Sequence, residues 1–197
     1  LGIVMPRKHR CPNCTESYID HPNIMCSAGC VPIKLLGSEL DLDLQAFKTA
    51  ARTIAETLHS AWGSDHYIRA TGHGVSSSEI QAIVKDSIEE LGFEPEKKNR
   101  VGMAGFKPDF TDAEGKVIIE VERGKTIDNN MDMLDMWKCH VHPTASHLIL
   151  VVPVWYQTGK DTPVVKSCTY GKVCARLELF FEEQNLTNVR AAAIIGY

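Results

Sequence analysis

A continuous apolar run over residues 147–155 constrains the fold of this chain more than any other feature. The run has the length of a strand, and it is far shorter than the roughly 20 residues that a helix needs to cross a bilayer. A strand without alternating polar residues is buried on both faces, so it lies inside a sheet that helices cover on both sides. The sequence therefore predicts a layered α/β fold.

The rest of the chain alternates between helical and strand patterns. Apolar residues recur at three- and four-residue spacing in segments that we expect to be helices: 38–63, 76–92, 128–140 and 168–184. Short strand patterns occupy further segments: 93–97, 105–110, 116–122 and 191–197. A loop is expected at 64–76. From residue 76 the order is helix, three-strand meander, helix, strand, helix, strand, which is typical of a mixed sheet flanked by helices.

Two glutamates interrupt the strand at 116–122. Glu120 and Glu122 are two residues apart, so their side chains point to one face, opposite the apolar row of Val117, Ile119 and Val121. Asp109 lies on the preceding strand of the hairpin, where it can sit beside Glu120. Like charges in an apolar strand repel unless they are solvated or share a cation. Three converging carboxylates suit Mg²⁺, and Glu79 at the start of the preceding helix can supply a fourth.

This order of motifs resembles the PD-(D/E)xK nuclease superfamily. The matching elements are the helix that carries Glu79, then Pro108-Asp109, then Glu120-Val121-Glu122, then a helix and a buried strand. Many type II restriction endonucleases, Holliday-junction resolvases and repair exonucleases share this fold. The resemblance covers about residues 76–155, and it implies a restriction-endonuclease-like mixed sheet and metal-dependent hydrolysis of DNA phosphodiester bonds.

The resemblance also implies roles for single residues. Asp109 and Glu120 would bind Mg²⁺ or Mn²⁺, and Glu79 would complete the metal site. The position that usually carries the family's lysine is Glu122 here, as in some restriction enzymes. The residue that orients or polarises the attacking water therefore stays open among Glu122, Lys125 and Lys138.

A polar segment follows the acidic strand directly. Arg123 and Lys125 could hold backbone phosphates. Asn129 and Asn130 could either cap the next helix or read bases.

Residues 1–37 show little periodicity and are expected to form a small zinc-binding module ahead of an α/β domain over residues 38–197. Four cysteines in the module are spaced as C-x2-C and C-x3-C pairs: Cys11, Cys14, Cys26 and Cys30. Four thiolates suit tetrahedral Zn²⁺, and His9 or His21 could replace one ligand. A structural zinc would stabilise a segment that lacks its own core.

A basic stretch precedes the first cysteine pair. Arg7, Lys8 and Arg10 could grip DNA. The module could equally brace the α/β domain or form a dimer contact.

Composition narrows the class of protein. Hydrophobic residues make up 44% and charged residues 23% of the 197 positions, which is an ordinary globular balance. The net charge of −4 argues against a protein that coats nucleic acid by bulk charge. The odd count of seven cysteines argues against a closed disulfide framework. With no secretory pattern near the N-terminus, we expect a soluble cytoplasmic protein with no membrane partner.

The sequence thus predicts a Mg²⁺-dependent DNA endonuclease with a structural zinc. Restriction-type cleavage is favoured, and because cutting both strands needs two sites, a homodimer is expected. A junction-resolving or repair nuclease is the close alternative. A non-catalytic module that kept the fold and binds DNA or protein is the rival from another class.

Overall fold

The computed structural model describes residues 8–10, 17–19, 32–38, 40–70, 76–95, 107–123, 125–158, 164–183 and 185–197. Its α-helices are α1 (Gln45–Ala70), α2 (Ser77–Ile88), α3 (Met131–Val141) and α4 (Thr169–Glu178). Its 3₁₀ turns are η1 (Asp41–Asp43), η2 (Glu89–Leu91) and η3 (Leu179–Phe181). Its strands are β1 (Lys8–Arg10), β2 (Ser17–Ile19), β3 (Ile33–Gly37), β4 (Glu94–Pro95), β5 (Phe110–Thr111), β6 (Val117–Val121), β7 (His147–Val152), β8 (Trp155–Thr158), β9 (Val164–Cys168) and β10 (Ala191–Gly196).

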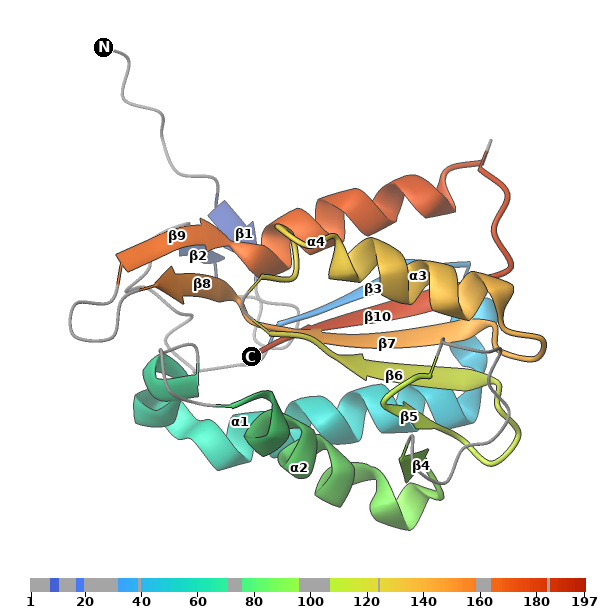
Figure 1. Ribbon diagram of the computed structural model, residues 1–197, viewed down its shortest axis with the longest axis horizontal. Helices are drawn as coiled ribbons and strands as arrows, with labels where there is room; N and C mark the ends of the chain where they lie inside the picture. The colour runs from blue at the N-terminus through green and yellow to red at the C-terminus, as the bar shows by residue number, and fades with distance from the viewer. Residues whose placement is uncertain are drawn as a thin grey trace.

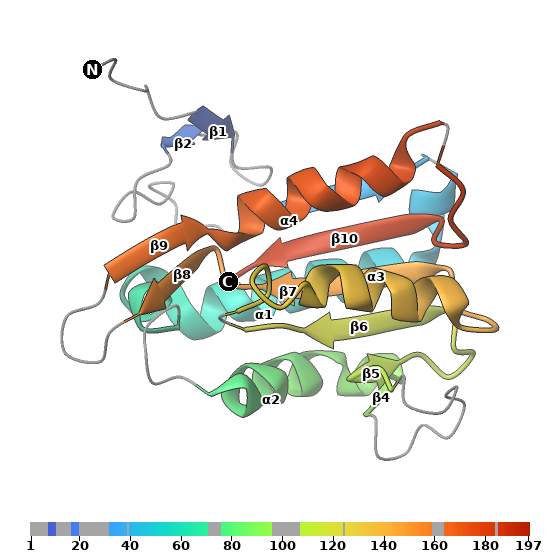
Figure 2. The same ribbon diagram turned by 45° about the horizontal axis from the view of Figure 1, so that its top comes forward.

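A mixed six-stranded sheet forms the centre of the molecule, in the order β3-β10-β7-β6-β5-β4. Strands β6, β7 and β10 run parallel to one another, whereas β3, β5 and β4 pair antiparallel with their neighbours. Helices α1 and α2 cover one face of the sheet and α3 and α4 cover the other (Figure 1, Figure 2). The α/β class, the meander and the crossover through α3 are confirmed, and the layout is consistent with a restriction-endonuclease-like fold.

Strand β7 is buried on both faces, as its unbroken apolar sequence predicts. Ile149 and Val151 pack with α1 and α2, while Leu148 and Leu150 pack with α3 and α4. The alternation in β6 follows the same rule. Its apolar row of Val117, Ile119 and Val121 faces α1 and α2, and Ile118 faces the opposite side. The row that continues from Ile118 to Glu120 therefore points toward α3.

Helix α1 is longer than the sequence pattern indicates. The pattern predicts a stop at Gly63 and a loop over 64–76, but the helix runs on to Ala70. A single glycine costs a helix only about 1 kcal/mol, which neighbouring turns can offset. Helix α2, by contrast, starts and ends as expected, since Ser76 caps it and Gly92 ends the following turn in the left-handed region at φ 80°.

Several strands were not expected from the sequence: β1, β2 and β3 in the first 37 residues, and β8 and β9 in the second half of the chain. Strand β3 (Ile33–Gly37) pairs with β10 at the edge of the main sheet. The division of the chain after residue 37 stays a prediction, and β3 lies on its N-terminal side. Strands β8 and β9 form a separate antiparallel pair between β7 and α4.

Helix α3 is rotated relative to the prediction. Leu134 and Trp137 belong to the apolar pattern of this segment, but they are 37% and 53% exposed. The face toward the sheet carries the fully buried Met136 and Cys139, together with Asp135 and its partner Lys138. None of the helices in the described part of the chain is long and apolar enough to cross a membrane.

Candidate active site

The hairpin of β5 and β6 brings Asp109 beside Glu120. Asp109 directly precedes β5, and Phe110 pairs with Ile119 across the hairpin. The backbone N–H of Asp109 donates to Glu120 Oε2 at 3.4 Å, and the N–H of Val121 donates to Asp109 Oδ2 at 2.8 Å. The two carboxyl groups that the sequence placed side by side therefore lie within one backbone hydrogen-bond network.

Helix α3 adds a lysine and a further carboxylate to this pair. Lys138 Nζ donates to Glu120 Oε1 at 3.0 Å and to Asp135 Oδ1 at 2.9 Å. Glu120 is 2% exposed and Asp135 is fully buried. A lysine that binds two buried carboxylates is held in one position. Of the three candidates for the lysine role, Lys138 contacts Glu120, whereas Lys125 is exposed.

The Lys138 ammonium balances part of the negative charge. Burial raises the pKa of Glu120 well above its ordinary range, and the neighbouring Asp135 raises it further, while Lys138 opposes both. Burial alone would lower the pKa of Lys138, but the carboxylates of Glu120 and Asp135 outweigh it and hold that pKa above the usual value. The lysine is therefore charged at any physiological pH.

Glu122 forms a second carboxyl pair with Asp135. Burial raises the pKa of Glu122 to about 8, and the charge and hydrogen bond of Asp135 add to that shift. The Oδ2 atom of Asp135 is buried and receives no hydrogen bond from a donor group among the described residues. Two facing carboxyl groups in this state share a proton or attract a cation.

Two supporting residues hold the acidic cluster in place. Gln81 on α2 donates from Nε2 to Asp109 Oδ1 at 3.0 Å. The hydroxyl of the buried Tyr197 donates to the backbone oxygen of Glu122 at 2.8 Å. Neither residue belongs to a recognisable sequence motif. Asp135 was missed as well, although its spacing from Lys138 on a helix could have indicated it.

The structure uses Glu79 as a helix cap. Its carboxylate accepts the backbone N–H of Ser76, and the Ser76 hydroxyl accepts the N–H of Glu79, which makes a reciprocal capping box. The hydrogen bonds from Ser76 lower the pKa of Glu79, with a smaller contribution from Arg123. Its carboxylate is hydrogen-bonded to Ser76, and the α2 side chain that reaches Asp109 is Gln81.

Replacing Glu79 by alanine tests this capping role. We expect the midpoint of thermal unfolding to fall by about 2–4 °C, because one backbone N–H at the start of α2 loses its partner. The Glu79→Gln variant keeps a capping oxygen and should retain the wild-type midpoint. Thermal unfolding of the three proteins checks this. A strong loss of metal affinity in both variants would instead assign Glu79 to the metal site.

The pH dependence of stability tests the half-buried Glu122. The pKa of this group is about 8 in the fold against 4.5 in a solvated glutamate. Between these values the folded chain holds a proton that the unfolded chain has lost, so stability falls as the pH rises. In metal-free buffer, Glu122→Gln should therefore exceed the wild type by on the order of 2–4 kcal/mol at pH 8 and match it near pH 4.5.

The control for that comparison is the exposed Glu90 on η2. Glu90→Gln should change the free energy of unfolding by less than about 0.5 kcal/mol at either pH. Denaturant titrations at the two pH values measure both variants. If the free energies of unfolding of Glu122→Gln and the wild type differed by the same amount at both pH values, the raised pKa of Glu122 would be contradicted.

The remaining site candidates lie at the edge of this cluster or outside the described residues. Arg123 is half-buried, and Lys125, Asn129 and Asn130 are exposed. Asn130 directly precedes α3, but its side chain makes no capping hydrogen bond to the helix. Its Oδ1 instead accepts a hydrogen bond from Arg176 at 2.7 Å. The other candidates lie outside the residues whose side chains are described: Arg7, Lys8, Arg10, Cys11, Cys14, Cys26 and Cys30.

The donor set suits a hard divalent cation. Within the described ranges, no group of three or more His, Cys, Asp or Glu side chains is already arranged around a metal position. Lys138 binds Glu120 and Asp135 in this state. The carboxylates of Asp109 and Glu120 come from neighbouring strands, and the unsatisfied oxygen of Asp135 lies in the same cluster. Converging carboxylate oxygens are the ligands that Mg²⁺ prefers.

Comparison with known proteins gives a likeness of fold to a solved structure. No protein-family model matches the sequence, and no curated protein matches it either. The chain is similar to restriction endonuclease BglII complexed with a DNA 16-mer, with a TM-score of 0.49 and 11% sequence identity, over 84% of this chain and 77% of that chain. At this identity the likeness concerns the fold alone. The strand order and the flanking helices define the fold of this chain.

Proposed function

We propose that this chain is a Mg²⁺-dependent DNA endonuclease of the PD-(D/E)xK type. The observation that carries the proposal is the contact of Lys138 with Glu120, next to Asp109 in the hairpin. Two carboxylates from adjacent strands and a half-buried lysine supply the groups that phosphodiester hydrolysis needs. The lysine comes from α3 and not from the usual position on the acidic strand.

Each residue has a distinct role in this proposal. Asp109 and Glu120 hold Mg²⁺ or Mn²⁺, which when bound makes water a better nucleophile and stabilises charge on the phosphate. Lys138 donates a hydrogen bond to the attacking water or to a phosphate oxygen. Asp135 orients Lys138 through the 2.9 Å contact.

Glu122 is the candidate general base. Its pKa of about 8 lies near neutral pH, where a base is most effective. The water oxygen bonds to phosphorus and one water proton passes to Glu122, while the bond from phosphorus to one deoxyribose oxygen breaks and that oxygen takes a proton from solvent to leave as a hydroxyl. Lys125 is exposed on the loop after β6. In this proposal Lys125, Arg123, Asn129 and Asn130 contact the DNA backbone or bases.

Restriction-type cleavage by a homodimer is the form of this activity that we favour. The Glu-Val-Glu sequence of β6 supports it through its resemblance to some restriction enzymes. A junction-resolving or repair nuclease would use the same site. The non-catalytic rival drew its support from the missing lysine at position 122, and the contact between Lys138 and Glu120 weakens that support.

We also propose that Cys11, Cys14, Cys26 and Cys30 bind a structural Zn²⁺. Elemental analysis of the purified protein should find about one zinc per chain if the four thiolates form one tetrahedral site. Absence of zinc, with folding unchanged after treatment with a chelator, would remove this proposal.

Incubation of the purified chain with mixed-sequence plasmid and genomic DNA tests the nuclease activity. The reactions contain Mg²⁺, Mn²⁺ or EDTA, and Asp109→Asn is purified and assayed in parallel so that a contaminating nuclease would appear in both. Discrete fragments from the wild type alone would establish a sequence-specific endonuclease. A smear would indicate a repair-type or non-specific nuclease.

Absence of cleavage on these substrates calls for branched and modified DNA under the same conditions. If the wild type binds DNA but leaves every substrate intact with both metals, the activity is excluded and the binding-module reading replaces it.

A further inference from the structure

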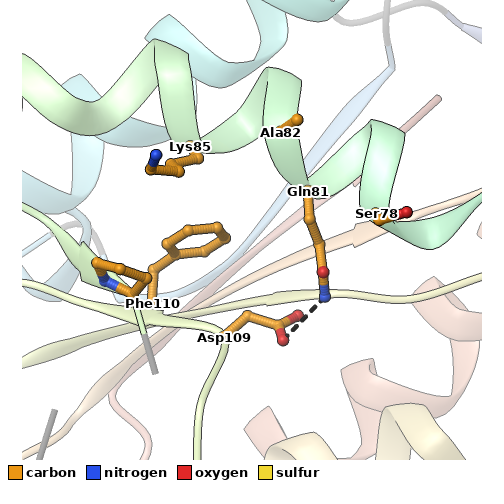
Figure 3. A pocket seen from close by; sticks show the side chains of 7 residues that line it. Ser78, Gln81, Ala82, Lys85, Asp109 and Phe110 are labelled. Atoms are coloured by element: carbon orange, nitrogen blue, oxygen red, sulfur yellow. Dashed lines mark hydrogen bonds between the residues drawn. The ribbon is translucent and has the colours of Figure 1, made fainter. Parts of the chain in front are cut away.

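A pocket of about 400 Å³ lies between α2 and the edge of the sheet, directly beside Asp109. It is lined by Ser78, Gln81, Ala82, Lys85, Pro95, Asp109 and Phe110. Its volume is in the range of sites that bind small ligands. Figure 3 shows Gln81 reaching down from α2 to Asp109, with Lys85 further along the helix near the ring of Phe110.

The two sides of this pocket differ in chemistry. The sheet side offers the ring of Phe110 and Pro95, which are apolar surfaces. The helix side offers Ser78, Gln81 and Lys85, which recur at three- and four-residue spacing and so lie along one face of α2. A ligand that contacts both sides therefore needs a flat or apolar part for the sheet side and an anionic part for Lys85 on the helix side.

Lys85 is available for an anion. Its side chain is exposed, and it has no ion pair or hydrogen bond with any residue in the described part of the chain. It lies four residues beyond Gln81, a rise of about 6 Å along the helix axis. An anion on Lys85 would thus sit one helical turn away from the Asp109 carboxylate, at a distance that limits their repulsion.

Gln81 links the pocket to the candidate active site. Because a carboxylate only accepts hydrogen bonds, the contact with Asp109 uses one N–H of the Gln81 amide. The second N–H and the amide oxygen stay available for a ligand in the pocket. A group bound here is therefore held in fixed relation to Asp109.

From these observations we propose that the pocket binds one nucleotide of the DNA strand, adjacent to the phosphodiester that is cleaved. Its phosphate lies on Lys85, and its sugar or base lies against Phe110 and Pro95 with Gln81 within hydrogen-bonding reach. The inference rests on the proposed nuclease function and assigns it a substrate-positioning site on α2.

The salt dependence of DNA binding tests the phosphate contact. Anisotropy of a labelled mixed-sequence duplex is measured over a range of salt concentrations, once with EDTA and once with Ca²⁺. Lys85→Ala should weaken binding about tenfold. It should also reduce the slope of log K against log salt by about 0.9, the value for one phosphate contact. Lys172→Ala, an exposed lysine on α4 at the opposite face, should keep the wild-type slope.

Filling the pocket is an independent test that removes no charge. Ala82 is exposed on α2 and lines the pocket, so Ala82→Trp should block the nucleotide and weaken binding about tenfold. Ala175→Trp places the same side chain on an exposed position of α4 and should bind like the wild type. Thermal unfolding of all four variants confirms that each is folded.

The outcomes separate this inference from the proposed function. Unchanged affinity and salt slope in both Lys85→Ala and Ala82→Trp would overturn the pocket assignment, whatever the cleavage assay shows. If the wild type binds DNA but cleaves no substrate, the nuclease proposal is overturned. The slopes of log K against log salt then still decide whether the pocket binds a nucleotide. A wild type that binds no DNA with EDTA or with Ca²⁺ would overturn both.

Discussion

Asp109→Asn is expected to slow DNA cleavage in Mg²⁺ by at least about 10³-fold. A catalytic metal stabilises the transition state by several kcal/mol, and each 1.36 kcal/mol corresponds to about a tenfold change in rate. The substitution removes one charged metal ligand. It also keeps the shape of the side chain, because the amide oxygen can still accept the N–H of Val121. The amide nitrogen can donate to Gln81 once the Gln81 amide has turned over.

The same variant should bind DNA at least as tightly as the wild type, since a negative charge is removed near the phosphates. Asp112→Asn is the matched control in the same hairpin. The Oδ1 atom of Asp112 accepts the N–H of Val117 at 2.9 Å, and an asparagine keeps that bond. Initial rates and DNA affinity are measured for both. Cleavage by Asp109→Asn at a rate close to that of the wild type would refute the assignment of the site.

Lys138→Met is expected to lower both cleavage and stability. The variant leaves the buried Glu120 and Asp135 without their counter-ion, and breaking a buried ion pair costs on the order of 3 kcal/mol. For a chain of this size that loss lowers the unfolding midpoint by roughly 6–12 °C at pH 8. The loss of stability should shrink as the pH falls, because burial raises the pKa values of Glu120 and Asp135 and a protonated carboxyl group needs no counter-ion.

Lys125→Met is the control that separates the two lysines. Lys125 is exposed on the loop after β6, so its loss should change stability by less than about 0.5 kcal/mol. We expect cleavage to fall by about 10²-fold or more for Lys138→Met, the range for a preorganised donor at the reacting phosphate, and by less than tenfold for Lys125→Met. Cleavage is measured at a temperature well below both midpoints. If Lys125→Met lost more cleavage than Lys138→Met, the catalytic lysine would be Lys125 on the loop.

The meander and its carboxylates could be predicted from the sequence because their signals are local. Alternation along β6 assigns Glu120 and Val121 to opposite faces without knowledge of the rest of the fold. The hairpin turn after Asp112 then brings Asp109 back beside Glu120. The continuous apolar sequence of β7 could be assigned to the sheet interior for the same reason.

The contacts of Glu79 and Lys138 could not be predicted in this way. The sequence from Ser76 to Glu79 has the spacing of a capping box, and that local use of the carboxylate was overlooked. For α3, apolar residues were assumed to face the sheet. The helix buries Met136 and Cys139, turns Asp135 and Lys138 toward the same side, and leaves Trp137 exposed. A pattern based on hydrophobicity assigns the wrong face when ion pairs stabilise buried charges.

The sequence by itself determined the α/β class, the strand order around the acidic hairpin and the proximity of Asp109 to Glu120. These depend on side-chain periodicity and on turns, which act over a few residues. Only the tertiary structure decided that Lys138 binds Glu120, that Asp135 pairs with Glu122, and that Gln81 reaches Asp109. Those contacts join separate elements, and their geometry depends on how α2 and α3 pack on the two faces of the sheet.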